Sequence, residues 1–194
     1  MIITFEGGDQ AGKKTQSQLL ASALAKKRIR TKILSFPDYT TPIGKEINNF
    51  LHGKRKYPHQ VVHCLLAANR WEKLNEIKKA NSKNSIVIMN RYYESNFVYG
   101  LVNGMKLDWL ENLDRGIPKS NLVIVLDVTQ KESFVRKKSQ RDRFEKNKNF
   151  VQKISNTYRL LAKKFGWKIV DASGTKQEIH QAIMKIVLKR LEKR

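Results

Sequence analysis

Five apolar segments of strand length recur along the chain, and segments with helix-type patterns separate them. The apolar segments are rich in Ile, Val and Leu and cover residues 2–6, 32–36, 86–90, 122–128 and 168–171. Continuous apolar runs of this length are typical of strands that are buried on both faces of a parallel sheet. The intervening pattern predicts helices near 13–28, 43–51, 58–80, 94–100, 106–114, 131–137, 145–165 and 176–192. This alternation predicts an α/β fold with a doubly wound parallel sheet.

Nothing in the sequence divides this pattern into separate units. The chain has 194 residues and contains no repeat, no Pro/Ser-rich linker and no low-complexity tail, so we expect residues 1–194 to form a single domain. Two of the predicted helices carry a recognisable start signal. Thr129 with Glu132, and Thr175 with Glu178, have the spacing of a capping box.

The segment between the first strand and the first helix has the pattern of a phosphate-binding P-loop. The spacing fits G-x-x-x-x-G-K, and the segment consists of Gly7, Gly8, Asp9, Gln10, Ala11, Gly12, Lys13, Lys14 and Thr15. Glycines allow the backbone to wrap closely around phosphate oxygens, while the loop N–H groups and the positive end of the helix face the anion. Lys13 adds a positive charge for the outer phosphates. The alternative, a glycine turn with an unrelated lysine, does not account for the strand and helix on either side. The segment therefore predicts binding of a nucleoside triphosphate.

One position departs from the P-loop pattern. Lys14 stands where a Ser or Thr hydroxyl normally binds magnesium, and Thr15 follows one place later.

Composition and charge narrow the possible partners. The net charge of +22 favours polyanions, but the basic residues are scattered along the chain, as on a solvated surface, so we do not expect nucleic acid to be the partner. No apolar run approaches the ~18 residues that cross a bilayer, and no export signal is visible. The only cysteine, Cys64, suits the cytoplasm. It lies with His63 in the apolar run 61–66, which predicts that both side chains are packed.

The stretch 136–149 is too polar for the core. It contains Arg136, Arg141 and Arg143, and it is a candidate lid over the site, because a planar guanidinium matches phosphate oxygens and the charge that spreads in a phosphoryl-transfer transition state. The alternative is a solvated loop.

Six blocks of sequence stand in order between residue 2 and about residue 171. They read FEGGDQAGK from Phe5, FPDYTTPIG from Phe36, ANRWE from Ala68, NRYYESN from Asn90, GIPKSNL from Gly116 and RDRFE from Arg141. In order and spacing they resemble the motifs of the thymidylate kinase family of P-loop nucleoside monophosphate kinases. The resemblance implies a P-loop kinase fold with a five-stranded parallel sheet flanked by helices and an Arg-rich lid. It also implies transfer of the ATP γ-phosphoryl group to dTMP, and commonly a homodimer.

The resemblance implies roles for individual residues. Lys13 would hold the ATP phosphates and Arg91 the acceptor phosphate. In part of the family an arginine at the position of Gln10 reaches the transferred group; its absence here suggests that lid arginines take this task, Arg143 first and Arg141 second. The acceptor pocket implied by the family comprises Asp9, Phe36, Tyr39, Leu66, Arg70, Arg91, Asn96, Tyr99 and Glu145.

Besides Lys14, two positions depart from the family pattern. Asn90 replaces an aspartate at the end of the third strand, and Leu66 stands where a phenylalanine often stacks on the base. Magnesium, the expected cofactor, would then be held by phosphates, water, Asp9 and Glu145. These departures leave two alternatives open: a (deoxy)pyrimidine monophosphate kinase of relaxed specificity, and a nucleotide- or nucleic-acid-binding protein on a degenerate kinase fold.

Overall fold

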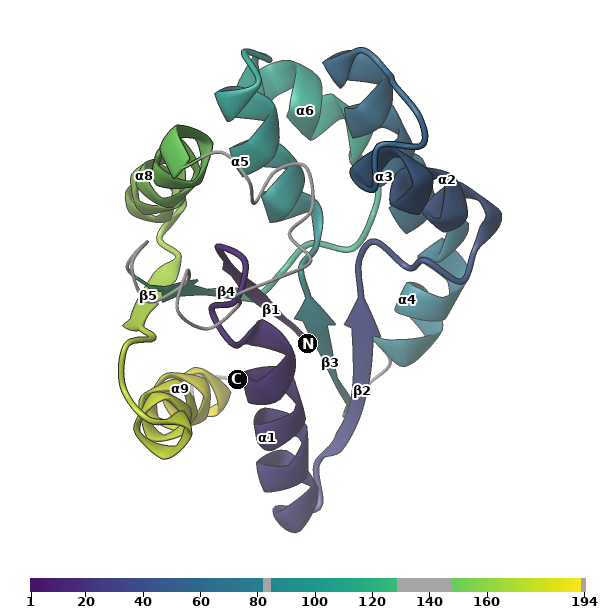
Figure 1. Cartoon of the computed structure of the whole chain (residues 1–194). Helices are drawn as coiled ribbons and strands as arrows, with labels where there is room; N and C mark the ends of the chain where they lie inside the picture. Colours follow the sequence, from purple (N-terminus) through teal and green to yellow (C-terminus); the bar gives the residue numbers. More distant parts are fainter. Residues whose placement is uncertain (82–84, 129–147, 193–194) are drawn as a thin grey trace.

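A parallel β-sheet lies at the centre of the computed structural model, which describes residues 1–81, 85–128 and 148–192 (Figure 1). Within these residues the sheet has five strands in the order β2-β3-β1-β4-β5, all parallel. The strands are β1 (Ile2–Gly7), β2 (Arg30–Ser35), β3 (Ser85–Asn90), β4 (Leu122–Asp127) and β5 (Lys168–Asp171). The expected five-stranded parallel sheet is therefore confirmed.

The prediction that every strand is buried on both faces was wrong for the two edge strands. The central strands β1, β3 and β4 are almost wholly buried. In β2 only Leu34 is buried, and in β5 only Val170. An edge strand has one neighbouring strand instead of two, and the helices that flank the sheet cover its rim less completely. Polar residues such as Lys32 and Lys168 are therefore tolerated there.

Helices cover both faces of the sheet (Figure 1). They are α1 (Lys13–Lys26), α2 (Pro42–Leu51), α3 (His59–Glu72), α4 (Leu74–Ala80), α5 (Tyr93–Val102), α6 (Leu107–Leu113), α8 (Lys148–Phe165) and α9 (Lys176–Leu191). On one face α1 and α9 pack against Ile3, Phe5 and their neighbours. On the other face α5, α6 and α8 pack against Val123 and Val125. In the described part of the chain no helix combines the length and apolar character needed to cross a membrane.

Most predicted helices are present, with one difference in the segment 58–80. It forms two helices, α3 and α4, which are separated at Lys73, and the Lys73 ammonium lies 3.1 Å from the Asp38 carboxylate. The capping box at the start of α9 is confirmed: the Thr175 hydroxyl accepts from the Glu178 N–H at 3.3 Å. The helix predicted at 131–137, its capping pair Thr129 and Glu132, and most of the predicted lid lie outside the described residues.

The sheet brings three loops together at the carboxyl ends of its strands. The Arg91 N–H donates to the Phe5 carbonyl at 3.0 Å, and the Phe36 N–H donates to the Asn90 carbonyl at 3.1 Å. These two bonds continue the ladder one residue beyond the strands and fix the first residues of the loops after β2 and β3. The carboxyl edge of a parallel α/β sheet is where ligands usually bind.

The loop after β2 is held by a close approach to α2. The Thr41 side chain caps this helix by accepting from the Gly44 N–H at 3.0 Å. A Cβ on Gly44 would lie only 1.8 Å from the Asp38 carbonyl oxygen. A glycine at this position therefore allows the loop that carries Phe36 and Tyr39 to pack against the helix.

Gly44→Ala should lower the free energy of unfolding by about 2 kcal/mol or more, because loop and helix must separate. Lys45→Ala, at the exposed neighbouring position, should change it by less than about 0.5 kcal/mol. Urea unfolding of both variants measures the difference. Equal stability of the two would show that the close approach does not hold the loop.

Candidate active site

The loop between β1 and α1 has the strongly curved backbone that the P-loop pattern predicts. Gly7 has a φ of 129°, and a Cβ there would lie 2.3 Å from the Leu126 carbonyl oxygen on the neighbouring strand. Gln10 also has a positive φ, of 64°, and Gly12 is the N-cap of α1 with φ 89°. The loop N–H groups therefore lie next to a helix N-terminus, a combination that favours anion binding.

The Lys13 side chain is buried within this loop. Its ammonium donates to the Gly7 carbonyl at 3.1 Å and to the Gly8 carbonyl at 2.6 Å. The positive charge is therefore already placed beside the loop backbone. Lys14 is exposed, and Thr15 is partly exposed.

A cavity of about 120 Å³ lies beside the loop. It brings together every acceptor residue predicted from the sequence except Glu145, which is outside the described residues: Asp9, Phe36, Tyr39, Leu66, Arg70, Arg91, Asn96 and Tyr99. Five further lining residues were not predicted from the sequence, namely Pro37, Leu51, His63, Tyr92 and Ser95. The cavity is thus apolar on one side and carries two arginines and a carboxylate on the other.

Arg91 lies at the centre of the polar side. It follows β3 directly, with a positive φ of 63°, and its guanidinium donates to Asp9, to Ser95 Oγ at 3.0 Å and to Tyr158 OH at 3.2 Å. Burial alone would lower the pKa of Arg91, but the groups around it, Tyr99 and Asp9 first, raise this pKa well above its ordinary value. A left-handed backbone at a non-glycine residue is strained and is typical of functional sites.

The Asp9 carboxylate is charged at neutral pH. Burial would raise its pKa, but the positive charges of Arg91 and Lys13 lower it below the ordinary value, and the Tyr99 hydroxyl donates to it at 3.3 Å. Asp9 thus stands between the two cations that face the loop and the cavity.

Glu6 supports Arg91 from inside the sheet. This fully buried carboxylate accepts from Tyr158 OH at 2.7 Å and from Ser95 Oγ at 2.6 Å, and it lies 3.8 Å from the Arg91 guanidinium. No role was predicted from the sequence for Glu6, Ser95 or Tyr158. A glutamate within an otherwise apolar strand was the available signal for Glu6, whereas nothing in the sequence singles out Tyr158 on α8.

Arg70 is held in place by a buried acidic partner. Its Nε and Nη2 atoms each donate to Asp114 at 2.7 Å, in an ion pair whose side chains are both about 3% exposed. Asp114 therefore fixes the guanidinium from behind and engages two of its three nitrogens. Asp114 does not engage the two hydrogens of Nη1 and the second hydrogen of Nη2, so this edge of the guanidinium is left for the base-edge contact that the resemblance implies.

Asn96 is also held in place by a neighbour. Its Oδ1 lies 2.5 Å from Nδ1 of the buried His63, whose pKa is lowered mainly by burial. The packed position predicted for His63 is therefore confirmed. The same prediction was wrong for Cys64, which is exposed because it lies on the outer side of α3.

Several predicted residues cannot be placed. Arg136, Arg141, Arg143 and Glu145 lie outside the described residues, and the structure has α8 beginning at Lys148, inside the predicted lid boundary of 136–149. Asn90 is described: its amide donates to Ser35 Oγ at 3.4 Å. In the described residues no three His, Cys, Asp or Glu side chains are grouped so that they could hold a metal ion.

The protein has a P-loop after β1 and, beside it, an arginine-lined cavity at the carboxyl edge of a parallel sheet. This combination defines a phosphotransferase of the P-loop nucleoside monophosphate kinase class.

Comparisons with known proteins agree. The sequence model of the thymidylate kinase family matches residues 5–183. The chain is 33% identical to the thymidylate kinase of Schizosaccharomyces pombe over 191 residues, which cover 96% of this chain and 90% of that protein. It is 34% identical to the human thymidylate kinase, with 94% and 87% of the two chains covered.

A solved structure is similar over almost the whole chain. The thymidylate kinase of Candida albicans superposes with a TM-score of 0.86 at 29% identity, covering 97% of this chain and 91% of that one. The chain therefore belongs to the thymidylate kinase family and has the P-loop kinase fold expected from the sequence.

Asp114→Asn should lower the free energy of unfolding by about 3 kcal/mol or more, because it leaves the buried Arg70 guanidinium without a compensating charge. Asp108→Asn, an exposed residue on α6, is the matched control and should have little effect. Chemical denaturation of both proteins gives the comparison. If Asp114→Asn were as stable as its control, Arg70 would not depend on this pair.

Proposed function

We propose that the chain catalyses transfer of the γ-phosphoryl group of ATP to dTMP, giving ADP and dTDP. The observation that carries the proposal is the position of Arg91: its guanidinium lines the cavity beside the P-loop and is held between the Asp9 and Glu6 carboxylates. A nucleoside monophosphate brings a phosphate dianion to such a guanidinium, and the P-loop places a second anion next to it.

The reaction needs positioning and charge neutralisation more than covalent help from the protein. The loop N–H groups and Lys13 would bind the ATP phosphates, with the ammonium exchanging its contacts to Gly7 and Gly8 for phosphate oxygens. Arg91 would exchange its contact with Asp9 for the acceptor phosphate. An oxygen of that phosphate then attacks the γ-phosphorus, and the bond to the β–γ bridging oxygen breaks as ADP leaves.

The rest of the cavity would bind the nucleoside. Phe36, Tyr39 and Leu66 provide apolar surface for the base, and the Arg70 guanidinium, which Asp114 holds in place, would hydrogen-bond the base edge. Asp9 and Tyr99 lie on the phosphate side, where the sugar would pass. Asn96 also lines the cavity, and its contact with His63 holds it in position there. From the family resemblance we assign the stabilisation of the transferred group to the lid arginines Arg143 and Arg141, and a substrate contact to Glu145.

The oxygen atoms available at the site fit a Mg²⁺ ion that arrives bound to the nucleotide phosphates. Mg²⁺ keeps several waters and needs few protein carboxylates when phosphates are present. Asp9 is the one carboxylate that lines the cavity among the described residues, so it would hold the ion with Glu145, directly or through water. The ion would neutralise phosphate charge when bound. Neither Lys14 nor Asn90 offers a carboxylate or hydroxyl oxygen to it.

A broader acceptor range is the second candidate, because one wall of the base pocket is Leu66 rather than an aromatic ring. Base stacking on an aromatic side chain is worth roughly 1–3 kcal/mol, and leucine provides only apolar contact. Broad substrate specificity is described for the structurally similar Candida albicans enzyme.

We also propose a homodimer in the cytoplasm. On α3 the partly or fully exposed residues Val61, Cys64, Ala68 and Trp71 follow helical spacing along one side, which gives a second copy an apolar surface. The free, exposed Cys64 thiol suits a reducing compartment.

Light scattering should give about twice the mass of 22.6 kDa, and Val61→Glu should reduce the measured mass to that of one chain. A monomeric wild type would refute the dimer.

The acceptor preference can be measured with purified protein, ATP, Mg²⁺ and a panel of dTMP, UMP, dUMP and dCMP. We expect dTDP formation with dTMP, and Leu66→Phe should lower KM for the acceptors by about tenfold because an aromatic ring adds base stacking. No diphosphate product from dTMP would refute the proposed function. Equal specificity constants across the panel would instead support the second candidate.

A further inference from the structure

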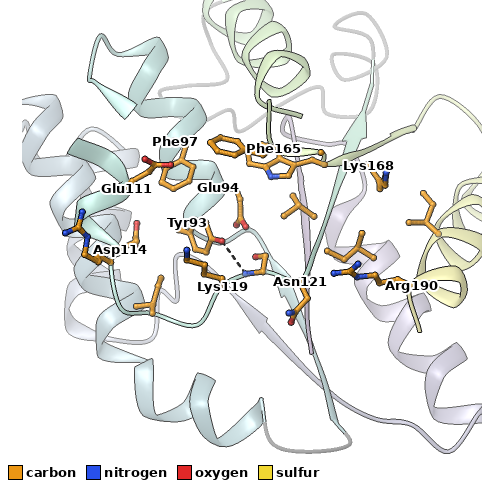
Figure 2. A pocket seen from close by; sticks show the side chains of 18 of the residues that line it. Tyr93, Glu94, Phe97, Glu111, Asp114, Lys119, Asn121, Phe165, Lys168 and Arg190 are labelled. Atoms are coloured by element: carbon orange, nitrogen blue, oxygen red, sulfur yellow. Dashed lines mark hydrogen bonds between the residues drawn. The ribbon is translucent and has the colours of Figure 1, made fainter. Parts of the chain in front are cut away.

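A second and larger cavity, of about 1210 Å³, lies away from the P-loop at the amino ends of β4 and β5 (Figure 2). It is an open cavity bordered by α5, α6, the end of α8 and the last turns of α9, with the 114–121 loop along one side. None of the residues assigned to phosphoryl transfer lines it. It shares the helices α5 and α8 with the candidate active site, and Asp114, the partner of Arg70, also lines it.

Glu94 is the unusual feature of this cavity. Its side chain is 1% exposed and lines the cavity, and neither carboxyl oxygen has a hydrogen-bond partner of good geometry among the described residues, although the Ser120 and Tyr93 side chains lie close by. In Figure 2 the side chain stands in the middle of the lining residues. Buried polar groups are nearly always hydrogen-bonded, so a carboxyl without a well-placed protein partner at the wall of a large cavity is available to a ligand.

The surroundings of Glu94 favour its neutral form. Burial, and next the negative charge of Glu6, raise the pKa of Glu94 to about 8, while the nearby Ser120 and Tyr93 lower it by less. At neutral pH the group is therefore mostly a carboxylic acid, which can donate one hydrogen bond and accept others. A neutral polar edge suits it better than a cation.

The mouth of the cavity is basic on the α9 side. Lys168, Lys185, Lys189 and Arg190 are all exposed there, and none of them has an acidic partner among the described residues. The acidic residues Asp108 and Glu111 come from α6. Several free cations on one side attract an anionic group.

An aromatic wall lies between the basic mouth and α5. The rings of Phe165 and Trp167 are stacked, with centroids 5.6 Å apart and an interplanar angle of 22°, and Phe97 lies 6.4 Å from Phe165. Phe165 is 38% exposed, so part of its surface is available to a ligand. Flat rings stack on such surfaces with little dependence on their identity.

We propose that this cavity binds a nucleoside phosphate at a second site. The ring would lie against Phe165 and Trp167 with a polar edge at Glu94, and the phosphates would meet Lys189 and Arg190. The aromatic rings, the Glu94 carboxyl and the basic side chains would each bind one part of such a ligand. An inorganic polyphosphate has no ring to stack, and a nucleoside has no charge to pair with the basic side chains.

The test uses the full-length protein labelled with 5-fluorotryptophan, and follows the ¹⁹F resonance of Trp167, which Trp167→Phe assigns. The probes are dTTP, thymidine and inorganic tripolyphosphate. We expect dTTP to shift this resonance saturably, and to bind about tenfold or more tightly than the other two probes. Tripolyphosphate binding as tightly as dTTP would overturn the proposal, because the site would then be a polyanion patch. No shift with dTTP would overturn it as well.

Variants locate the response. Glu94→Leu, and Lys189→Glu combined with Arg190→Glu, should each weaken dTTP binding by about tenfold or more. Lys26→Glu combined with Lys27→Glu makes the same charge change on exposed residues at the end of α1, and this control should change the affinity for dTTP less than twofold. Equal losses of dTTP affinity in the two double variants would overturn the proposal, because the attraction would then be non-specific. Lys13→Met should leave the Trp167 response intact, and its loss would assign the response to the P-loop.

Discussion

The structure depends on one arrangement of charges, in which Arg91 is held between Asp9 and Glu6. The Glu6 carboxylate is fully buried in the central strand, where an unpaired charge would be costly, and Arg91, Ser95 and Tyr158 compensate it. Because Glu6 is fixed by the sheet, the guanidinium is fixed as well. The more exposed Asp9 is the partner that can be exchanged for a phosphate, whereas Glu6 remains in place. The site is therefore organised before the substrate arrives, which reduces the reorganisation needed during phosphoryl transfer.

The parallel sheet places these groups together. Asp9 follows β1, Phe36 follows β2 and Arg91 follows β3, and these three strands are neighbours in the sheet. Residues more than 80 positions apart in the chain, such as Asp9 and Arg91, therefore meet at one edge. Tyr158 brings α8, the helix that follows residues 129–147, into contact with Arg91 and with the Glu6 carboxylate. The part of the cavity that would bind the nucleotide base is held separately, by the buried ion pair of Arg70 and Asp114.

Much of the fold could be predicted because apolar runs and helix patterns are local signals. The P-loop was predictable for the same reason, since its glycines and Lys13 are adjacent in sequence. The exposure of β2 and β5 could not be predicted, because it depends on which strands become edges. The division between α3 and α4 at Lys73 involves no Pro or Gly, and the contact of Lys73 with Asp38 belongs to the folded structure.

The partners of site residues were also beyond the sequence. Arg70 and Asp114 are 44 positions apart, and nothing local pairs them. Glu94 reads as an ordinary polar residue near the start of a helix, and only the structure places its carboxyl in a cavity. Family resemblance identified residues that could touch the substrates, whereas the groups that hold those residues in place, Glu6, Tyr158 and Asp114, became visible only in three dimensions.

The kinetics of Arg91→Lys, with Arg159→Lys as a matched control outside the cavity, probe this charge arrangement at its centre. Lysine keeps the positive charge but cannot contact Ser95, Tyr158 and an acceptor phosphate together. We expect kcat/KM for dTMP to fall by about 100-fold or more in Arg91→Lys, while KM for ATP and the control variant stay close to wild type. An Arg91→Lys enzyme with wild-type kcat/KM for dTMP would show that the guanidinium does not organise the site.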